Sequence, residues 1–349
     1  MKTLAETPLE HPFVNRGMPI EPKIWTVEIP DDPKKRRLEF ADFNPGGGGK
    51  PVLAAHGRGQ RGPISWSHYA EARLERGERI FAPSFSTHGA SSSPRPDVFT
   101  QRPQHIESIE DQVGQLHFAI RYVSDLANGG NSLPVVDQSF SGLIAAIYLQ
   151  GHEGLPKPMA ESRVGLGSLA EAYMDLPLPG GFKLPLTYPI ARGIVAALKF
   201  FGKESTDFAP GDGRAELVGI RSQQVNGGPV QSHDRERASK VIETEIANFL
   251  YTTDNPSLGT LEAFFKGRDM ALDPKMRGKS SAPQLLIIGE EDYINKPKMT
   301  ERMADHMGAE KLIIPHALHE SMQLLDRPHG IGDQVLDAID DFYARHHGS

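Results

Sequence analysis

Apolar and polar positions along the first half of the chain alternate between strand-like and helix-like patterns. Residues 23–29 and 38–43 have the pattern of a first pair of strands, which we expect to be antiparallel. The short apolar run at 51–56 (PVLAAH) has the length of a buried strand. Residues 66–76 then predict a helix, and 79–84 (RIFAPS) predict the next strand.

The longest helical pattern lies between residues 106 and 126. Its apolar positions recur at alternating spacings of four and three residues, which places them on one face of a helix: Ile109, Val113, Leu116, Ile120 and Val123. The glycines after residue 128 end this helix. Residues 133–136 then form a short apolar strand, and 140–150 predict a helix with small residues near its start.

The same alternation returns near the C-terminus. We expect strands at 284–288 and 311–314, a helix at 298–306 and a closing amphipathic helix at 331–345. Strand–helix alternation predicts an α/β fold with a mostly parallel sheet that is covered on both faces. Such sheets carry their sites just past the C-terminal ends of the strands, so we expect reactive side chains at those positions.

Residues 170–275 interrupt the alternation. A Pro/Gly-rich stretch is followed by helical patterns at 190–201, 236–250 and 258–267. We interpret this segment as a mainly helical cap inserted between two parts of one core, 1–169 and 276–349. The alternative is an independent second domain, which the length of 349 residues also permits. The insertion is favoured because the strand–helix pattern resumes after it.

Composition narrows the function classes. The net charge of −7 makes a chain-wide nucleic-acid surface improbable, and the absence of cysteine excludes disulfides and thiolate chemistry. No apolar run is long enough for a membrane span, and the N-terminus lacks the pattern of a secretory signal. These observations favour a cytoplasmic protein with a small-molecule partner, in a monomeric or homodimeric state that the sequence leaves open.

The segment LPVVDQSFSG places Ser139 between a short strand and a helix that begins with small residues. This is the pattern of a nucleophile elbow, in which a tight strained turn exposes the serine hydroxyl. Ser141 supplies the small residue needed two positions after the serine, whereas Asp137 stands where glycine is usual. The alternative is that Ser139 merely caps an ordinary helix.

The run AHGRG follows the strand at 51–56 and forms a glycine-containing loop beside the expected serine turn. The backbone N–H of Arg58 and that of Phe140 are therefore candidate donors to an oxyanion. The alternative is a plain strand-to-loop turn.

Candidates for an acid and a base follow the two C-terminal strands. Asp292, in GEEDYI, can orient an imidazole, although Glu290 and Glu291 beside it have the pattern of a solvated acidic turn. His316 and His319, in IPHALHE, compete for the role of a base, because histidine exchanges its proton near neutral pH. Serine, acid and histidine thus occur at strand ends in the chain order that one fold uses.

In these motifs the sequence resembles the α/β-hydrolase fold superfamily, in particular its capped esterases and lactonases. The matching segments are PVLAAHGRG, HGASSSP, VVDQSFSG, LLIIGEEDYI and IIPHALHESM. The resemblance implies Ser139 as nucleophile, His319 as base and Asp292 as acid, with Glu171 in reserve because some members take the acid from the strand after the elbow. His319 is preferred to His316 because the histidine of the family stands fifth in a Pro-x-x-x-His stretch.

The resulting hypothesis is a serine hydrolase that cleaves an ester or lactone of a medium-sized, largely apolar small molecule through an acyl-enzyme, with no metal and no organic cofactor. A first alternative keeps the fold and changes the chemistry to that of a carbon–carbon hydrolase, lyase, acyltransferase or cofactor-free oxygenase. A second alternative is a ligand-binding protein that performs no reaction. A nucleophilic aspartate is disfavoured, because Asp137 lies two residues away from the required position.

Overall fold

The computed structural model describes residues 9–10, 13–58, 60–86, 88, 91, 106–169, 174–177, 183–186, 192–193, 197, 232–248 and 258–347. Within these residues nine strands form one sheet in the order β1-β2-β3-β5-β4-β6-β7-β10-β11. The strands are β1 (Leu9–Glu10), β2 (Lys23–Glu28), β3 (Arg37–Asp42), β4 (Lys50–Ala55), β5 (Glu78–Ser84), β6 (Leu133–Gln138), β7 (Ala160–Leu166), β10 (Gln284–Gly289) and β11 (Glu310–Ile314).

Antiparallel pairing is confined to one edge of this sheet. β1, β2, β3 and β5 pair with one another antiparallel, and every pair from β5 to β11 is parallel. The parallel part therefore collects the C-terminal ends of β4, β6, β7 and β10 at one rim, which is where the candidate residues lie.

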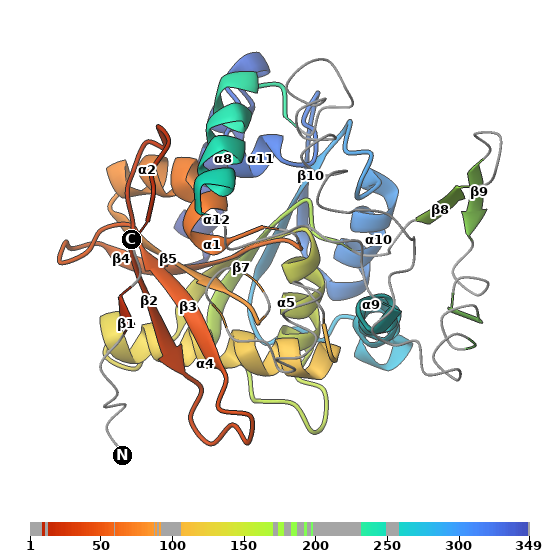
Figure 1. Cartoon of the computed structure of the whole chain (residues 1–349). Coiled ribbons are helices and arrows are strands. Elements are labelled where there is room, and N and C mark those ends of the chain that lie inside the picture. The colour runs from red at the N-terminus through yellow and green to blue at the C-terminus, as the bar shows by residue number, and fades with distance from the viewer. Residues whose placement is uncertain are drawn as a thin grey trace.

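Helices cover both faces of the sheet (Figure 1). One face packs against α4 (Ile109–Ala127), α5 (Phe140–Gln150), α9 (Leu258–Ala271) and α10 (Pro297–Met307), which together bury one hydrophobic cluster. The other face packs against α2 (Ser67–Glu75) and α12 (Ile331–His346) in a second cluster. The structure thus confirms the predicted fold class, a mostly parallel sheet covered on both faces.

Local chemistry explains where the helices begin and end. The Ser108 side chain accepts a hydrogen bond from the Asp111 N–H and caps α4, whose apolar face is the one predicted from the four-three spacing. Pro297 occupies the first turn of α10, where its missing N–H costs nothing, and Gly308 ends that helix in the left-handed conformation.

The predicted insertion at 170–275 contains strands as well as helices. β8 (Met174–Pro177) and β9 (Lys183–Leu186) form a two-stranded antiparallel sheet, and α8 (Arg235–Asn248) and α9 overlap two of the three expected helical patterns, 236–250 and 258–267. Most of the third pattern, 190–201, lies outside the described residues. Because Phe264 of α9 packs at 4.4 Å between ring centroids on Phe140 of α5, this helix shares the core cluster, and the boundary of a cap stays a prediction.

The start of α8 is attached to the segment that follows β11. The Asp326 carboxylate accepts hydrogen bonds from the Ser232 hydroxyl, the His233 N–H and the Ser321 hydroxyl, each at 2.6 Å. Arg237 donates to the backbone carbonyls at the C-terminal end of α11 (Ser321–Leu324). A segment of the predicted insertion is therefore fastened directly beside His319.

Candidate active site

Ser139 stands on a strained turn between β6 and α5. Its backbone has φ +56° and ψ −117°, a conformation that residues other than glycine rarely adopt. The Ser139 side chain makes no capping hydrogen bond to α5. The Ser141 hydroxyl fixes the turn, since it accepts from the Gln138 N–H at 3.0 Å and donates to the Ala55 carbonyl at 2.8 Å. This geometry is that of a nucleophile elbow rather than of an ordinary helix cap.

Asp137 lies beneath this turn, where a cationic side chain balances its charge. Its carboxylate forms a fully buried ion pair with Arg163 of β7, at 2.5 Å from Oδ2 to Nε, and also accepts from the Ser168 hydroxyl at 2.9 Å. The Arg163 guanidinium donates in addition to the Gly142 carbonyl at 2.8 Å. The unusual Asp137 therefore joins the turn to β7, and its negative charge is balanced by Arg163 and is not left unpaired beside Ser139.

The structure brings Asp292 and His319 together. His319 Nδ1 lies 2.8 Å from Asp292 Oδ2, and both side chains are almost completely buried. The second carboxylate oxygen, Oδ1, accepts from the Ile294 and Asn295 N–H groups at 2.9 and 2.8 Å. Because a carboxylate can only accept, the imidazole carries its proton on Nδ1 and presents the lone pair of Nε2 to the elbow.

The rival candidates are placed differently. His316 is exposed, and its Nδ1 lies 3.0 Å from Glu291, which is itself exposed on the acidic turn. Glu171 lies outside the described residues. Of the two histidines, His319 is the one that contacts a buried carboxylate.

The side chain of Gln138 contacts Nε2, the second nitrogen of the His319 imidazole. Its Nε2 lies 3.0 Å from His319 Nε2 and donates to it, and its own Oε1 is buried without a partner among the described residues. Among the described residues, the Ser139 hydroxyl has no hydrogen-bond partner. The amide of Gln138 therefore donates to the lone pair of His319 Nε2. This nitrogen is the atom that would accept the proton of a serine nucleophile.

The loop after β4 passes directly over Ser139. A Cβ added to Gly57 would lie 3.0 Å from the Ser139 Cβ and 2.2 Å from Gln138 Oε1, so a side chain is excluded there. His56 holds the loop, since its Nδ1 donates to the Gly57 carbonyl at 2.6 Å and its Nε2 accepts from the Phe85 N–H at 3.0 Å. Burial lowers the pKa of His56 to about 4, which keeps this ring neutral near pH 7.

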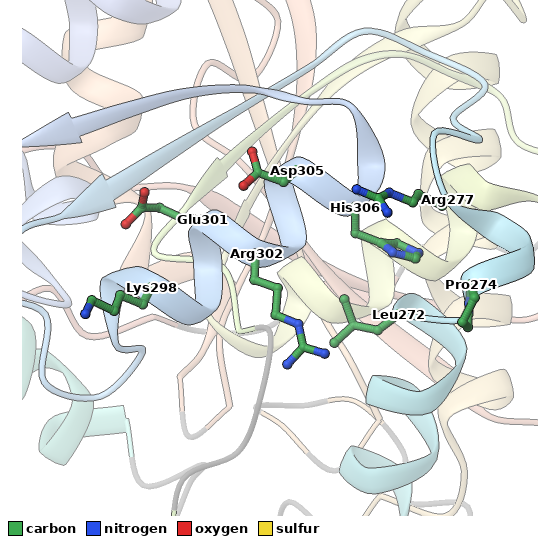
Figure 2. A pocket seen from close by; sticks show the side chains of 8 residues that line it. All are labelled: Leu272, Pro274, Arg277, Lys298, Glu301, Arg302, Asp305 and His306. Atoms are coloured by element: carbon green, nitrogen blue, oxygen red, sulfur yellow. The ribbon is translucent and has the colours of Figure 1, made fainter.

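A separate cavity lies away from these residues. It has a volume of about 570 Å³, is lined by side chains of α10 and of the segment after α9, and contains none of the predicted site residues. In Figure 2, Arg302 and His306 extend from α10 on the side where Leu272 and Pro274 lie. Since its lining contains no candidate nucleophile, the cavity offers no alternative to the elbow.

Several solved structures are similar to this chain over most of its length. A soluble variant of monoglyceride lipase from Saccharomyces cerevisiae is 16% identical, with a TM-score of 0.64 over 95% of this chain and 98% of that chain. A highly thermostable carboxyl esterase from Bacillus coagulans is 14% identical, with a TM-score of 0.63 over 93% and 98%. A monoacylglycerol lipase from Paleococcus ferrophilus is 18% identical, with a TM-score of 0.59 over 88% and 99%.

No protein-family model matches the sequence, and no curated protein is significantly similar to it. At the identities of the solved structures, the likeness establishes the fold. The chain has the α/β-hydrolase fold, as the sequence motifs predicted. None of the described helices is both long and apolar enough to cross a membrane.

Sequence reasoning missed three residues that shape this site. Arg163, the partner of Asp137, sits in a strand that no alternating pattern marks clearly. Asn295 donates to the Gly167 carbonyl at 2.5 Å and so ties the acid turn to the end of β7. Gln138 could have been singled out in the sequence because it directly precedes Ser139. Its contact with His319 could not, because that contact depends on the conformation of its side chain.

Proposed function

We propose that the protein is a serine hydrolase that cleaves a carboxylic ester or lactone through an acyl-enzyme. The observation that carries the proposal is the short chain of contacts at one rim of the sheet. Ser139 stands in a strained elbow directly after Gln138, whose amide contacts the His319 imidazole. That imidazole is bonded through Nδ1 to the buried carboxylate of Asp292. The likeness to esterases and monoacylglycerol lipases supports the same chemistry by analogy of fold.

In this mechanism the Ser139 oxygen attacks the ester carbonyl while His319 Nε2 takes its proton. Gln138 must first turn its amide away from Nε2, because the imidazole has one lone pair to offer. Asp292 keeps the His319 proton on Nδ1 and stabilises the imidazolium that forms. His319 then passes the proton to the leaving alcohol, and water, deprotonated by the same imidazole, releases the acid.

The oxyanion of the tetrahedral intermediate needs donors on the side opposite the base. The Phe140 N–H at the first position of α5 has no acceptor within its own helix, and the N–H of Arg58 makes no hydrogen bond in the described part of the chain. We assign these two groups to the oxyanion, in the positions that the sequence predicts.

One observation favours a second candidate function. Because Gln138, rather than Ser139, contacts the base, His319 can act as a proton acceptor for the substrate itself without a covalent step. A carbon–carbon hydrolase, a lyase or a cofactor-free oxygenase would use the imidazole in this way. Such an enzyme would depend on His319 and tolerate loss of the Ser139 hydroxyl.

A panel of para-nitrophenyl esters of increasing acyl length tests the proposal. We expect release of nitrophenol that saturates with substrate and is greatest for medium-length acyl chains. An initial burst of nitrophenol, equivalent to the enzyme present, would indicate an acyl-enzyme. Failure to hydrolyse any member of the panel would contradict ester hydrolysis and favour the second candidate.

A further inference from the structure

Arg58 is a cation without a counter-charge among the described residues, and the residue that precedes it in its loop, Gly57, closely approaches Ser139. It follows Gly57 in the loop that passes over Ser139, and the described part of the chain provides no hydrogen bond or ion pair to its guanidinium. The other arginines of this rim are paired, Arg61 with Glu39 at 2.6 Å and Arg163 with Asp137 at 2.5 Å. A partly buried charge normally has such a partner, because losing water around it is costly.

Arg58 is half-buried and carries its charge in this loop. Burial lowers the pKa of its guanidinium to about 10, so that it stays charged near pH 7. No carboxylate among the described residues counteracts this lowering of the Arg58 pKa.

Polar atoms in the segment after β5, which packs against this loop, are also without partners. The His88 ring lies 4.8 Å between centroids from the ring of His56, which precedes Gly57 and Arg58 in the loop. The Nε2 of His88 and the hydroxyl of Ser86 are buried and unbonded within the described residues. Buried polar groups without a partner are rare in folded proteins unless a ligand or water completes them.

From these observations we propose that Arg58 binds a carboxylate carried by the substrate, so that the enzyme prefers esters of dicarboxylic acids to neutral esters. A planar guanidinium with free donors binds a planar carboxylate through two parallel hydrogen bonds. The inference rests on the proposed ester hydrolysis and adds to it the charge of the substrate. The expected substrate is then an ester that carries a negative charge near the scissile carbonyl, and not a purely apolar ester.

The test compares mono-para-nitrophenyl glutarate, which carries a free carboxylate, with its methyl-capped diester, and the nitrophenol that each ester releases without enzyme is subtracted. We expect kcat/KM of the wild type to be higher for the anionic ester by about tenfold or more. Arg58→Gln should bring the ratio of the two kcat/KM values close to one, and Arg58→Lys should retain part of the preference. The ratio is the readout because Arg58 also contributes its N–H to the oxyanion. Arg121→Gln, which removes an exposed arginine of α4, should leave the ratio unchanged.

Binding of monomethyl glutarate, measured by calorimetry, provides an arm that needs no turnover. The wild type should bind this monoanion, and Arg58→Gln should weaken binding by about tenfold or more. Equal kcat/KM for the two esters in an active enzyme would overturn the anion site and leave ester hydrolysis intact. If neither ester is hydrolysed, the proposed ester hydrolysis is wrong, and the calorimetric measurement alone tests the anion site. The anion site would then be rejected if Arg58→Gln binds monomethyl glutarate as tightly as the wild type. It would also be rejected if the wild type does not bind monomethyl glutarate.

Discussion

Ser139→Ala should reduce kcat for a para-nitrophenyl ester on the order of 10³-fold or more. The variant loses the attacking oxygen, while the loop after β4, the acid turn and His319 stay in place. Residual turnover would come from the oxyanion donors and from binding alone, so we expect a much smaller change in KM than in kcat. Steady-state kinetics on the wild type and the variant, with matched unfolding curves, measure both quantities.

A surface serine provides the matched control for this experiment. Ser132 is exposed at the start of β6, so Ser132→Ala removes the same atom at a distance from the elbow and should retain wild-type kcat. Ser139→Ala with kcat within about tenfold of the wild type would eliminate the nucleophile assignment. In that event, a loss of activity confined to His319→Ala would point to the second candidate function.

Arg163→Met should lower the free energy of unfolding by about 3 to 5 kcal/mol. The substitution leaves the Asp137 carboxylate buried at 0% exposure without its cation, directly beneath the nucleophile elbow. Methionine fills similar volume, so the loss comes from the unpaired charge rather than from a cavity. Urea unfolding followed by circular dichroism measures the change.

Two further variants separate the buried charge from other causes. In Asp137→Ala combined with Arg163→Met, both charges are gone and most of the stability should return. Arg345→Met removes an exposed arginine that pairs with Glu310 at 2.5 Å and should change the unfolding free energy by less than about 1 kcal/mol. An Arg163→Met protein as stable as the wild type would contradict the conclusion that the buried ion pair supports this part of the fold.

Much of the fold could be predicted from the sequence because the apolar spacing is regular. The helix predicted at 140–150 agrees with α5 at both ends, since a strained serine precedes it and Gly151 in the left-handed conformation follows it. The strand β7 was harder to predict, because arginine and serine interrupt its apolar residues. Arg163 can be buried there because Asp137 on the neighbouring strand pairs with it, and the Ser162 hydroxyl contacts the His347 imidazole at 2.9 Å.

The candidate site was predictable in its chain order but not in its contacts. Asp292 and His319 follow β10 and β11, two adjacent parallel strands, and the strand ends bring them together as expected. The contact between Gln138 and His319 could not be predicted, because a flexible side chain reaches it across 181 positions of sequence. The neutralised Asp137 could not be predicted either, since its partner is a residue of another strand.

Labelling with a fluorophosphonate, followed by mass-spectrometric mapping of the modified residue, tests most directly whether an alcohol oxygen, an imidazole and a carboxylate act in series. Such reagents react with a serine whose hydroxyl an adjacent base activates. We predict a single adduct on Ser139 in the wild-type protein and a strong reduction of labelling in His319→Ala. An unlabelled protein that nevertheless turns over substrate, or an adduct on a different serine, would contradict the assignment of Ser139.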